Sequence, residues 1–120
     1  MASRVPYLGP PFCLAQASGI CVFATCPDDT YGYHGEIDLY AYDNACNETG
    51  SLLGVALPMY GMELDSQLPM AIVTTQEDTY SLPKMTYAGK DYGSTVHCWD
   101  AGTWTYFRFY KSACYMTFPF

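Results

Sequence analysis

The chain has 120 residues, 50% of them hydrophobic and only 14% charged, and 12 are tyrosines. This length is typical of one domain, which we predict to span residues 1–120. The formal net charge of −7 repels phosphate backbones and anionic lipid surfaces, which argues against a nucleic-acid partner.

The beginning of the chain predicts an extended arm followed by a first strand. Prolines recur in residues 1–12, and because proline fixes φ and lacks an amide donor, we expect an extended arm there. Residues 20–25 are β-branched and aromatic at their centre, as strands are. Residues 27–32 then combine Pro, Asp and Gly, which is typical of a turn.

The clearest strand pattern covers residues 36–42. Apolar and polar residues alternate there with a period of two, so we expect one buried and one exposed face. The two predicted faces hold Ile37, Leu39 and Ala41, and Asp38, Tyr40 and Tyr42. Asp43-Asn44 ends this strand, and residues 52–57 resume a strand pattern.

Strands also predominate in the rest of the chain. Residues 58–69 fit a short helix and an irregular loop equally well. The other predicted elements are a strand at 70–75, edge pieces at 79–82 and 85–87, a turn at 89–93, a strand at 95–99 and a final strand at 103–110. Because no long stretch keeps a helical period without Gly or Pro, we expect an all-β fold. It would be an antiparallel β-sandwich or barrel of about seven short strands with at most one short helix.

Two segments share a pattern that we interpret as a strand–turn–cysteine unit. Aligned on Cys46 and Cys114, both read Tyr, two polar residues, Ala, Cys, two variable residues and Thr. We interpret this unit as the element around which the fold is organised.

Six cysteines, an even number in a short chain, predict a disulfide framework of three bridges and an oxidising compartment. Close pairs of the C-x2-C kind, which zinc sites use, do not occur. The pairing of the cysteines stays open. Asn47-Glu48-Thr49 is an N-glycosylation acceptor and agrees with secretion. No leader is visible, which we interpret as the start of a mature secreted chain, and no apolar run is long enough to span a membrane.

The predicted strand at residues 103–110 carries the candidate binding face. Trp104, Tyr106, Arg108 and Tyr110 share one of its faces, where such residues anchor partners or stack on sugar rings. The structural alternative is cross-strand aromatic contact with Arg108 lying over a ring.

An enzymatic alternative rests on the two histidines. His34, Glu36, His97 and Arg108 are the kinds of group that ribonuclease chemistry uses. The chain is similar in size, acidity and disulfide use to small secreted guanyl-type ribonucleases, but no His follows Arg108 as their pattern requires. Cys98, beside His97, would point to the opposite face of a strand and could not pair with it.

Acidic turns offer a further alternative. Asp28-Asp29, Asp43-Asn44 and Glu48 are groups that suit Ca²⁺, but solvated turn carboxylates explain them as well. We therefore expect no bound metal and no cofactor.

In size, scattered even cysteines, acidity, Tyr and Gly content and Tyr-x-x-Ala-Cys strand ends, the chain resembles the small secreted cysteine-rich proteins of filamentous fungi. Those proteins act as effectors, elicitors or toxins on a host. The resemblance implies a non-enzymatic, extracellular protein that binds a host protein or a cell-wall carbohydrate. It leaves the oligomeric state open.

Overall fold

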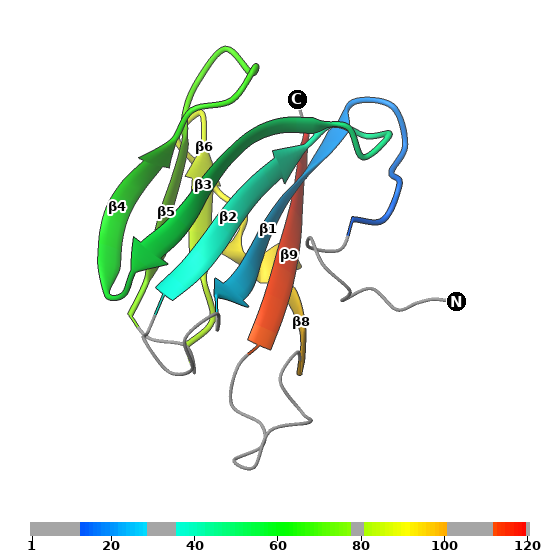
Figure 1. Cartoon of the computed structure of the whole chain (residues 1–120). Coiled ribbons are helices and arrows are strands. Elements are labelled where there is room, and N and C mark those ends of the chain that lie inside the picture. Colours follow the sequence, from blue (N-terminus) through cyan, green and yellow to red (C-terminus); the bar gives the residue numbers. More distant parts are fainter. Residues whose placement is uncertain (1–12, 29–35, 78–80, 101–111, 120) are drawn as a thin grey trace.

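The computed structural model describes residues 13–28, 36–77, 81–100 and 112–119. In these residues, nine strands form two antiparallel sheets that lie face to face (Figure 1). The strands are β1 (Ile20–Asp28), β2 (Glu36–Tyr42), β3 (Glu48–Ala56), β4 (Met59–Leu64), β5 (Ile72–Gln76), β6 (Lys84–Tyr87), β7 (Lys90–Asp91), β8 (His97–Asp100) and β9 (Ser112–Pro119). The five-stranded sheet has the order β3-β2-β1-β9-β8, and the four-stranded sheet has the order β4-β5-β6-β7. The predicted all-β fold is confirmed as a sandwich rather than a closed barrel, because both sheets end in edge strands within the described residues.

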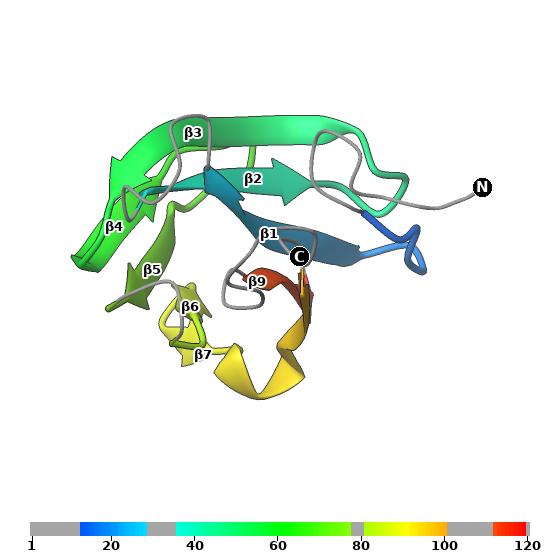
Figure 2. The same ribbon diagram turned by 60° about the horizontal axis from the view of Figure 1, so that its bottom comes forward.

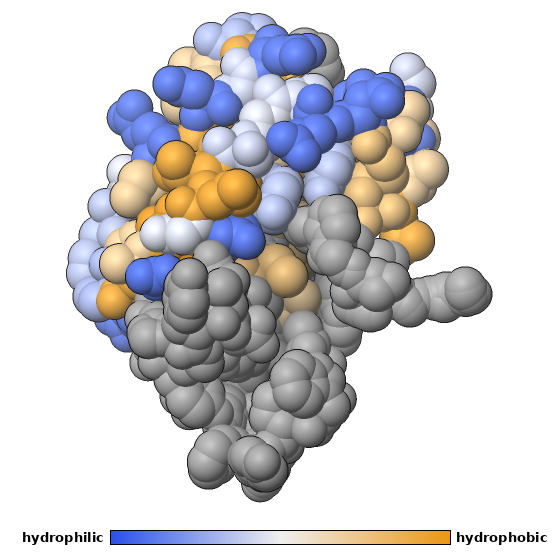
Figure 3. Space-filling model, in the orientation of Figure 1, coloured by the Kyte–Doolittle hydropathy of each residue, from blue (hydrophilic) through white to orange (hydrophobic). Residues whose placement is uncertain are grey.

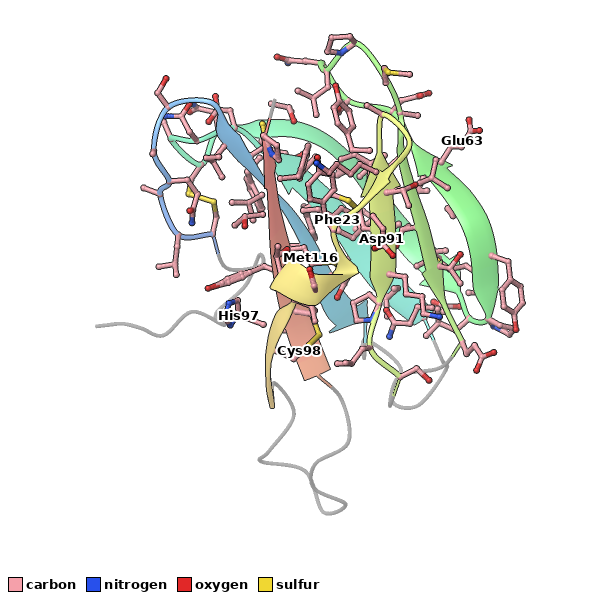
Figure 4. The ribbon with its side chains drawn as sticks, turned by 180° about the vertical axis from the view of Figure 1, so that it is seen from behind. Phe23, Glu63, Asp91, His97, Cys98 and Met116 are labelled. Atoms are coloured by element: carbon pink, nitrogen blue, oxygen red, sulfur yellow. A yellow bond between two sulfur atoms is a disulfide. The ribbon has the colours of Figure 1, made fainter. Side chains whose placement is uncertain are left out.

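The hydrophobic core lies between the sheets, which curve around it (Figure 2). Phe23, Leu39 and Met116 come from the five-stranded sheet, and Ile72 and Met85 from the other, and each is 0% exposed. Figure 4 shows Phe23 and Met116 in this interior. Each such buried side chain contributes roughly 1.5–3 kcal/mol relative to leaving it in water.

A single 3₁₀ turn, η1 (Gly93–Thr95), leads from the second sheet back to β8 and is the one helical segment of the described residues. The Thr95 hydroxyl donates to the Tyr92 carbonyl at 2.8 Å and accepts the Thr117 N–H at 3.1 Å. The Tyr92 ring lies 6.0 Å from the ring of Phe118. These contacts fix the connecting chain against β9. The presence of this single short turn agrees with the prediction of at most one short helix.

The strand pattern of residues 36–42 predicted β2 with its observed limits. Ile37, Leu39 and Ala41 are buried, as the alternation indicated. The residues of the other face include Tyr42, which is also buried at 7% exposed, so that face is covered in part.

The prediction of a helix or loop at residues 58–69 was wrong for their first half, which β4 occupies, whereas residues 65–69 form a loop. Gly61 has a positive φ of 63°, and the pairing with β5 shifts register between Met59 and Met62. Such a bulge inserts an extra residue and breaks the period of two that reveals a strand in sequence. The predicted turn at 89–93 likewise contains the two-residue strand β7.

The strand–turn–cysteine interpretation is confirmed for the first segment and wrong for the second. Cys46 lies in the turn between β2 and β3 with a φ of 66°, whereas Cys114 lies within β9. Residues 112–119, which the sequence did not indicate as a strand, pair with both β1 and β8. The predicted arm at 1–12 and strand at 103–110 lie outside the described residues.

Two disulfides form rather than the predicted three. One joins Cys13, ahead of β1, to Cys46, and the other joins Cys98 to Cys114 across β8 and β9. Cys21 and Cys26 belong to neither bridge. Both lie on β1 at an odd spacing, so their side chains point to opposite faces of the sheet and cannot meet.

This pairing predicts two thiols in the oxidised protein. Unfolding without reductant, followed by iodoacetamide, is expected to add two carbamidomethyl groups, at Cys21 and Cys26. Mass spectrometry of the digested protein checks both positions. Carbamidomethylation of none or of six cysteines would contradict the observed bridges.

Gly50 marks a close approach of two chain segments. A Cβ at this position would collide with the carbonyl oxygen of Asp65 and lie 2.9 Å from the Cα of Ser66. The Gln67 N–H also donates to the Thr49 carbonyl at 3.1 Å. The chain leaving β4 therefore crosses the start of β3 with no room for a side chain.

We expect Gly50→Ala to destabilise the protein by about 1–3 kcal/mol, because backbone atoms cannot move as a flexible side chain can. Chemical denaturation measures the change. Gly93→Ala is the matched control, since neither glycine has positive φ and the new Cβ at Gly93 meets only a side-chain oxygen of Asp91, at 3.2 Å. Equal losses of stability in the two variants would show that crowding at Gly50 is not the cause of the destabilisation.

Candidate binding site

The outer face of the five-stranded sheet carries one continuous row of residues, one from each strand. Tyr40 of β2 is registered with Ser51 of β3 and with Ala24 of β1. Ala24 is in turn registered with Tyr115 of β9, and Tyr115 with His97 of β8. Their sequence neighbours enter the core, so these side chains point to the opposite face. We call these five residues the outer row.

The aromatic rings of the outer row, together with Tyr42 beside it, form two groups. Tyr40 stacks on Tyr42, with ring centroids 6.2 Å apart and planes 10° from parallel. His97 and Tyr115 lie 5.3 Å apart with planes tilted by 51°. Ala24 separates the groups and places Tyr40 and Tyr115 roughly two strand spacings, or ~10 Å, apart.

The outer row is partly exposed and rests on a small apolar base. Val22, Ala24 and Tyr42 form a buried cluster on this face, against which Cys13, Tyr40 and Tyr115 pack. Tyr40 and Tyr115 are half-buried, whereas Ser51 and His97 at the ends are exposed. Apolar residues also gather over β3 on this face (Figure 3), where Leu53 is 62% exposed.

The hydroxyl of Tyr42 on this face is held in its neutral form. Burial raises the pKa of Tyr42 well above its usual value, and the nearby Glu48 carboxylate raises it further. No residue of the outer row is Lys, Arg, Asp or Glu. The outer row therefore offers ring surfaces and hydroxyl groups, while Asp38, on the same face of β2, carries a carboxylate that accepts the Gly54 N–H at 2.8 Å.

A pocket of about 220 Å³ opens at one end of the sandwich. It is lined by Gly19, Ile20, Cys21, Asp43, Asn44, Thr49, Gln67 and Leu68. Burial, and then the negative charge of Asp43, raise the pKa of the Cys21 thiol. A protonated, buried thiol is a poor nucleophile, so this pocket is not suited to cysteine chemistry.

Asp43 organises the turn beside this pocket. Its Oδ1 accepts the N–H groups of Ala45 and Asn47, both at 2.9 Å, and its Oδ2 accepts the Asn47 side-chain amide at 3.0 Å. These hydrogen bonds, led by the backbone N–H of Asn47, hold the pKa of the Asp43 carboxyl below its usual value.

The binding residues predicted from sequence, Trp104, Tyr106, Arg108 and Tyr110, lie outside the described residues, so that face stays a prediction. Sequence reasoning placed Tyr40 and Tyr42 together and singled out His97 for acid–base chemistry. The sequence did not indicate that Tyr115 lies in the same row. The row depends on the register between strands, and β9, which carries Tyr115, was not predicted.

The described residues do not bring the predicted ribonuclease groups together. His34 and Arg108 lie outside them, and β1 and β9 separate Glu36 from His97. Figure 4 shows His97 and Cys98 on opposite sides of β8, and Cys98 is engaged in a disulfide. No group of three or more His, Cys, Asp or Glu in the described parts of the chain could hold a metal ion. Nor does any helix there have the length and apolarity needed to cross a membrane.

Comparisons with protein-family models, with curated proteins and with solved structures found no match.

The Asp43 turn predicts a pH-dependent stability. Because the folded pKa is lowered, the ionised carboxylate stabilises the fold above the usual Asp value of about 3.9. That contribution is lost as the pH falls through the folded pKa. Asp43→Asn should therefore lower the melting temperature at pH ~7, and the difference from wild type should shrink toward pH ~2.5.

Thermal unfolding followed by circular dichroism at both pH values checks this. Glu63→Gln controls for net charge, since Glu63 is exposed on β4 and points away from the sheets (Figure 4). A difference between wild type and Asp43→Asn that is constant with pH would contradict the role of the carboxylate.

Proposed function

We propose that this protein is a non-enzymatic binding protein of the effector or toxin type, that it acts outside the cell, and that its ligand is a neutral cell-wall glycan. The observation that carries the proposal is the outer row, with aromatic rings on both sides of Ala24 and no charged residue. Sugar rings present apolar C–H faces and hydroxyl groups, which suit aromatic faces and neutral polar groups.

The two disulfides are compatible with an extracellular location. The Cys13–Cys46 bridge also holds the segment ahead of β1 near this face, since Cys13 packs against the buried cluster of Val22, Ala24 and Tyr42. A binding face on a cross-linked sheet loses little conformational entropy when a ligand docks, which favours affinity.

A neutral glycan fits the outer row better than an acidic polymer does. A net charge of −7 opposes acidic polymers over the whole molecule. A host protein is the alternative ligand for the same class of function, and it is an outcome of the test below.

We expect Tyr40→Ala, Tyr115→Ala and His97→Ala to weaken binding to insoluble chitin or β-glucan by roughly 3- to 10-fold each, the value of one aromatic contact. Tyr60→Ala is the matched control, because Tyr60 is 65% exposed on β4 of the other sheet. Sedimentation with the polymer measures the bound fraction, and circular dichroism verifies the fold. His97 is exposed, so its replacement tests the face with little risk to folding.

Trp104→Ala belongs in the same assay. A loss of binding in this variant alone would show that the site is the face predicted at residues 103–110. Absence of wild-type binding to either polymer would reject the glycan and leave a host protein as the ligand to be sought.

A further inference from the structure

The tripeptide Asn47-Glu48-Thr49 lies outside the outer row and matches the acceptor pattern for N-linked glycans. Asn47 is exposed in the turn between β2 and β3, and its neighbours Ala45 and Glu48 are exposed as well. Among the described residues, a glycan on Asn47 would therefore extend from an exposed part of the turn.

The hydrogen bonds of Asn47 are compatible with a modified side chain. Its Nδ2 donates to Asp43 Oδ2 at 3.0 Å. An unmodified amide carries two N–H bonds, and glycosylation replaces one of them. The remaining N–H can keep the contact with Asp43, so the turn does not have to open to carry a sugar.

Thr49 indicates when the sugar is added. Its hydroxyl donates to the Ala41 carbonyl at 3.2 Å and is partly buried in the folded hairpin. The transferase needs this hydroxyl beside the acceptor asparagine. A transfer to Asn47 therefore requires an open β2–β3 hairpin, and the folded turn would then present the glycan.

We propose that Asn47 carries an N-linked oligosaccharide. In the reaction, Asn47 Nδ2 forms a bond to C1 of the sugar, the bond between C1 and the pyrophosphate of a lipid-linked oligosaccharide breaks, and the amide proton leaves. The inference rests on the proposed extracellular function, since the donor and the transferase belong to the secretory pathway.

The position gives the glycan a physical role. It precedes β3, a nine-residue strand at the edge of the five-stranded sheet. Exposed edges pair with strands of other molecules unless something hinders their approach. β3 contains no Lys, Arg or Pro to discourage pairing, and a hydrated oligosaccharide at its beginning serves that purpose.

The test is secretion of the full chain, behind a cleavable leader, from a eukaryotic host, with intact mass measured before and after peptide-N-glycosidase F. Wild type is expected to lose an oligosaccharide mass and to show Asp at position 47 after the enzyme. Thr49→Ser should keep the glycan, because serine also supplies the hydroxyl, and Asn47→Gln should abolish it. Asn44→Gln, a neighbouring asparagine outside the tripeptide, should keep it.

The outcomes separate this inference from the proposed function. Wild-type protein that reaches the medium with both disulfides but without a glycan overturns the inference and leaves the binding proposal intact. Glycosylated protein that binds neither polymer overturns the glycan ligand and leaves Asn47 as a modification site. Retention of the sugar in Asn47→Gln would show that another residue carries it.

Discussion

Strand β1 pairs with β2 on one side and with β9 on the other, and both of its faces are covered. Phe23 on the inner face and Val22 on the outer face are both 0% exposed. A one-residue slip of this strand would exchange Phe23 and Ala24, placing a phenyl ring beneath the tyrosines and a methyl group in the core. The size difference between these two neighbours therefore locks the register of the whole sheet, and with it the outer row.

The parts of the fold that could be predicted from the sequence are those that depend on local alternation. β2 is the clearest case, because every second residue from Ile37 is buried even though its pairing with β3 shifts register. β4 escaped prediction because Gly61 interrupts the alternation. β9 escaped because residues 112–119 mix apolar and aromatic residues on both faces, as a strand covered on both sides does.

The site could be predicted less well, since it depends on which strands are neighbours. Tyr40 and Tyr115 are distant in sequence and share a row only because both are registered with Ala24. The residues around Ala24 in the sequence do not indicate this role. The disulfides follow the same logic. The sequence left the pairing of the cysteines open, and it became evident only when the strand order brought Cys13 to Cys46 and Cys98 to Cys114.

The bridge between Cys98 and Cys114 spans a sequence separation of 16 residues. A protease that cuts anywhere between these two cysteines leaves the fragments joined through sulfur. The nicked molecule would keep its mass apart from one added water and would migrate as two pieces only after reduction. The segment bridged by Cys13 and Cys46 has the same property. A single cut within either covalent loop therefore releases no piece of the protein.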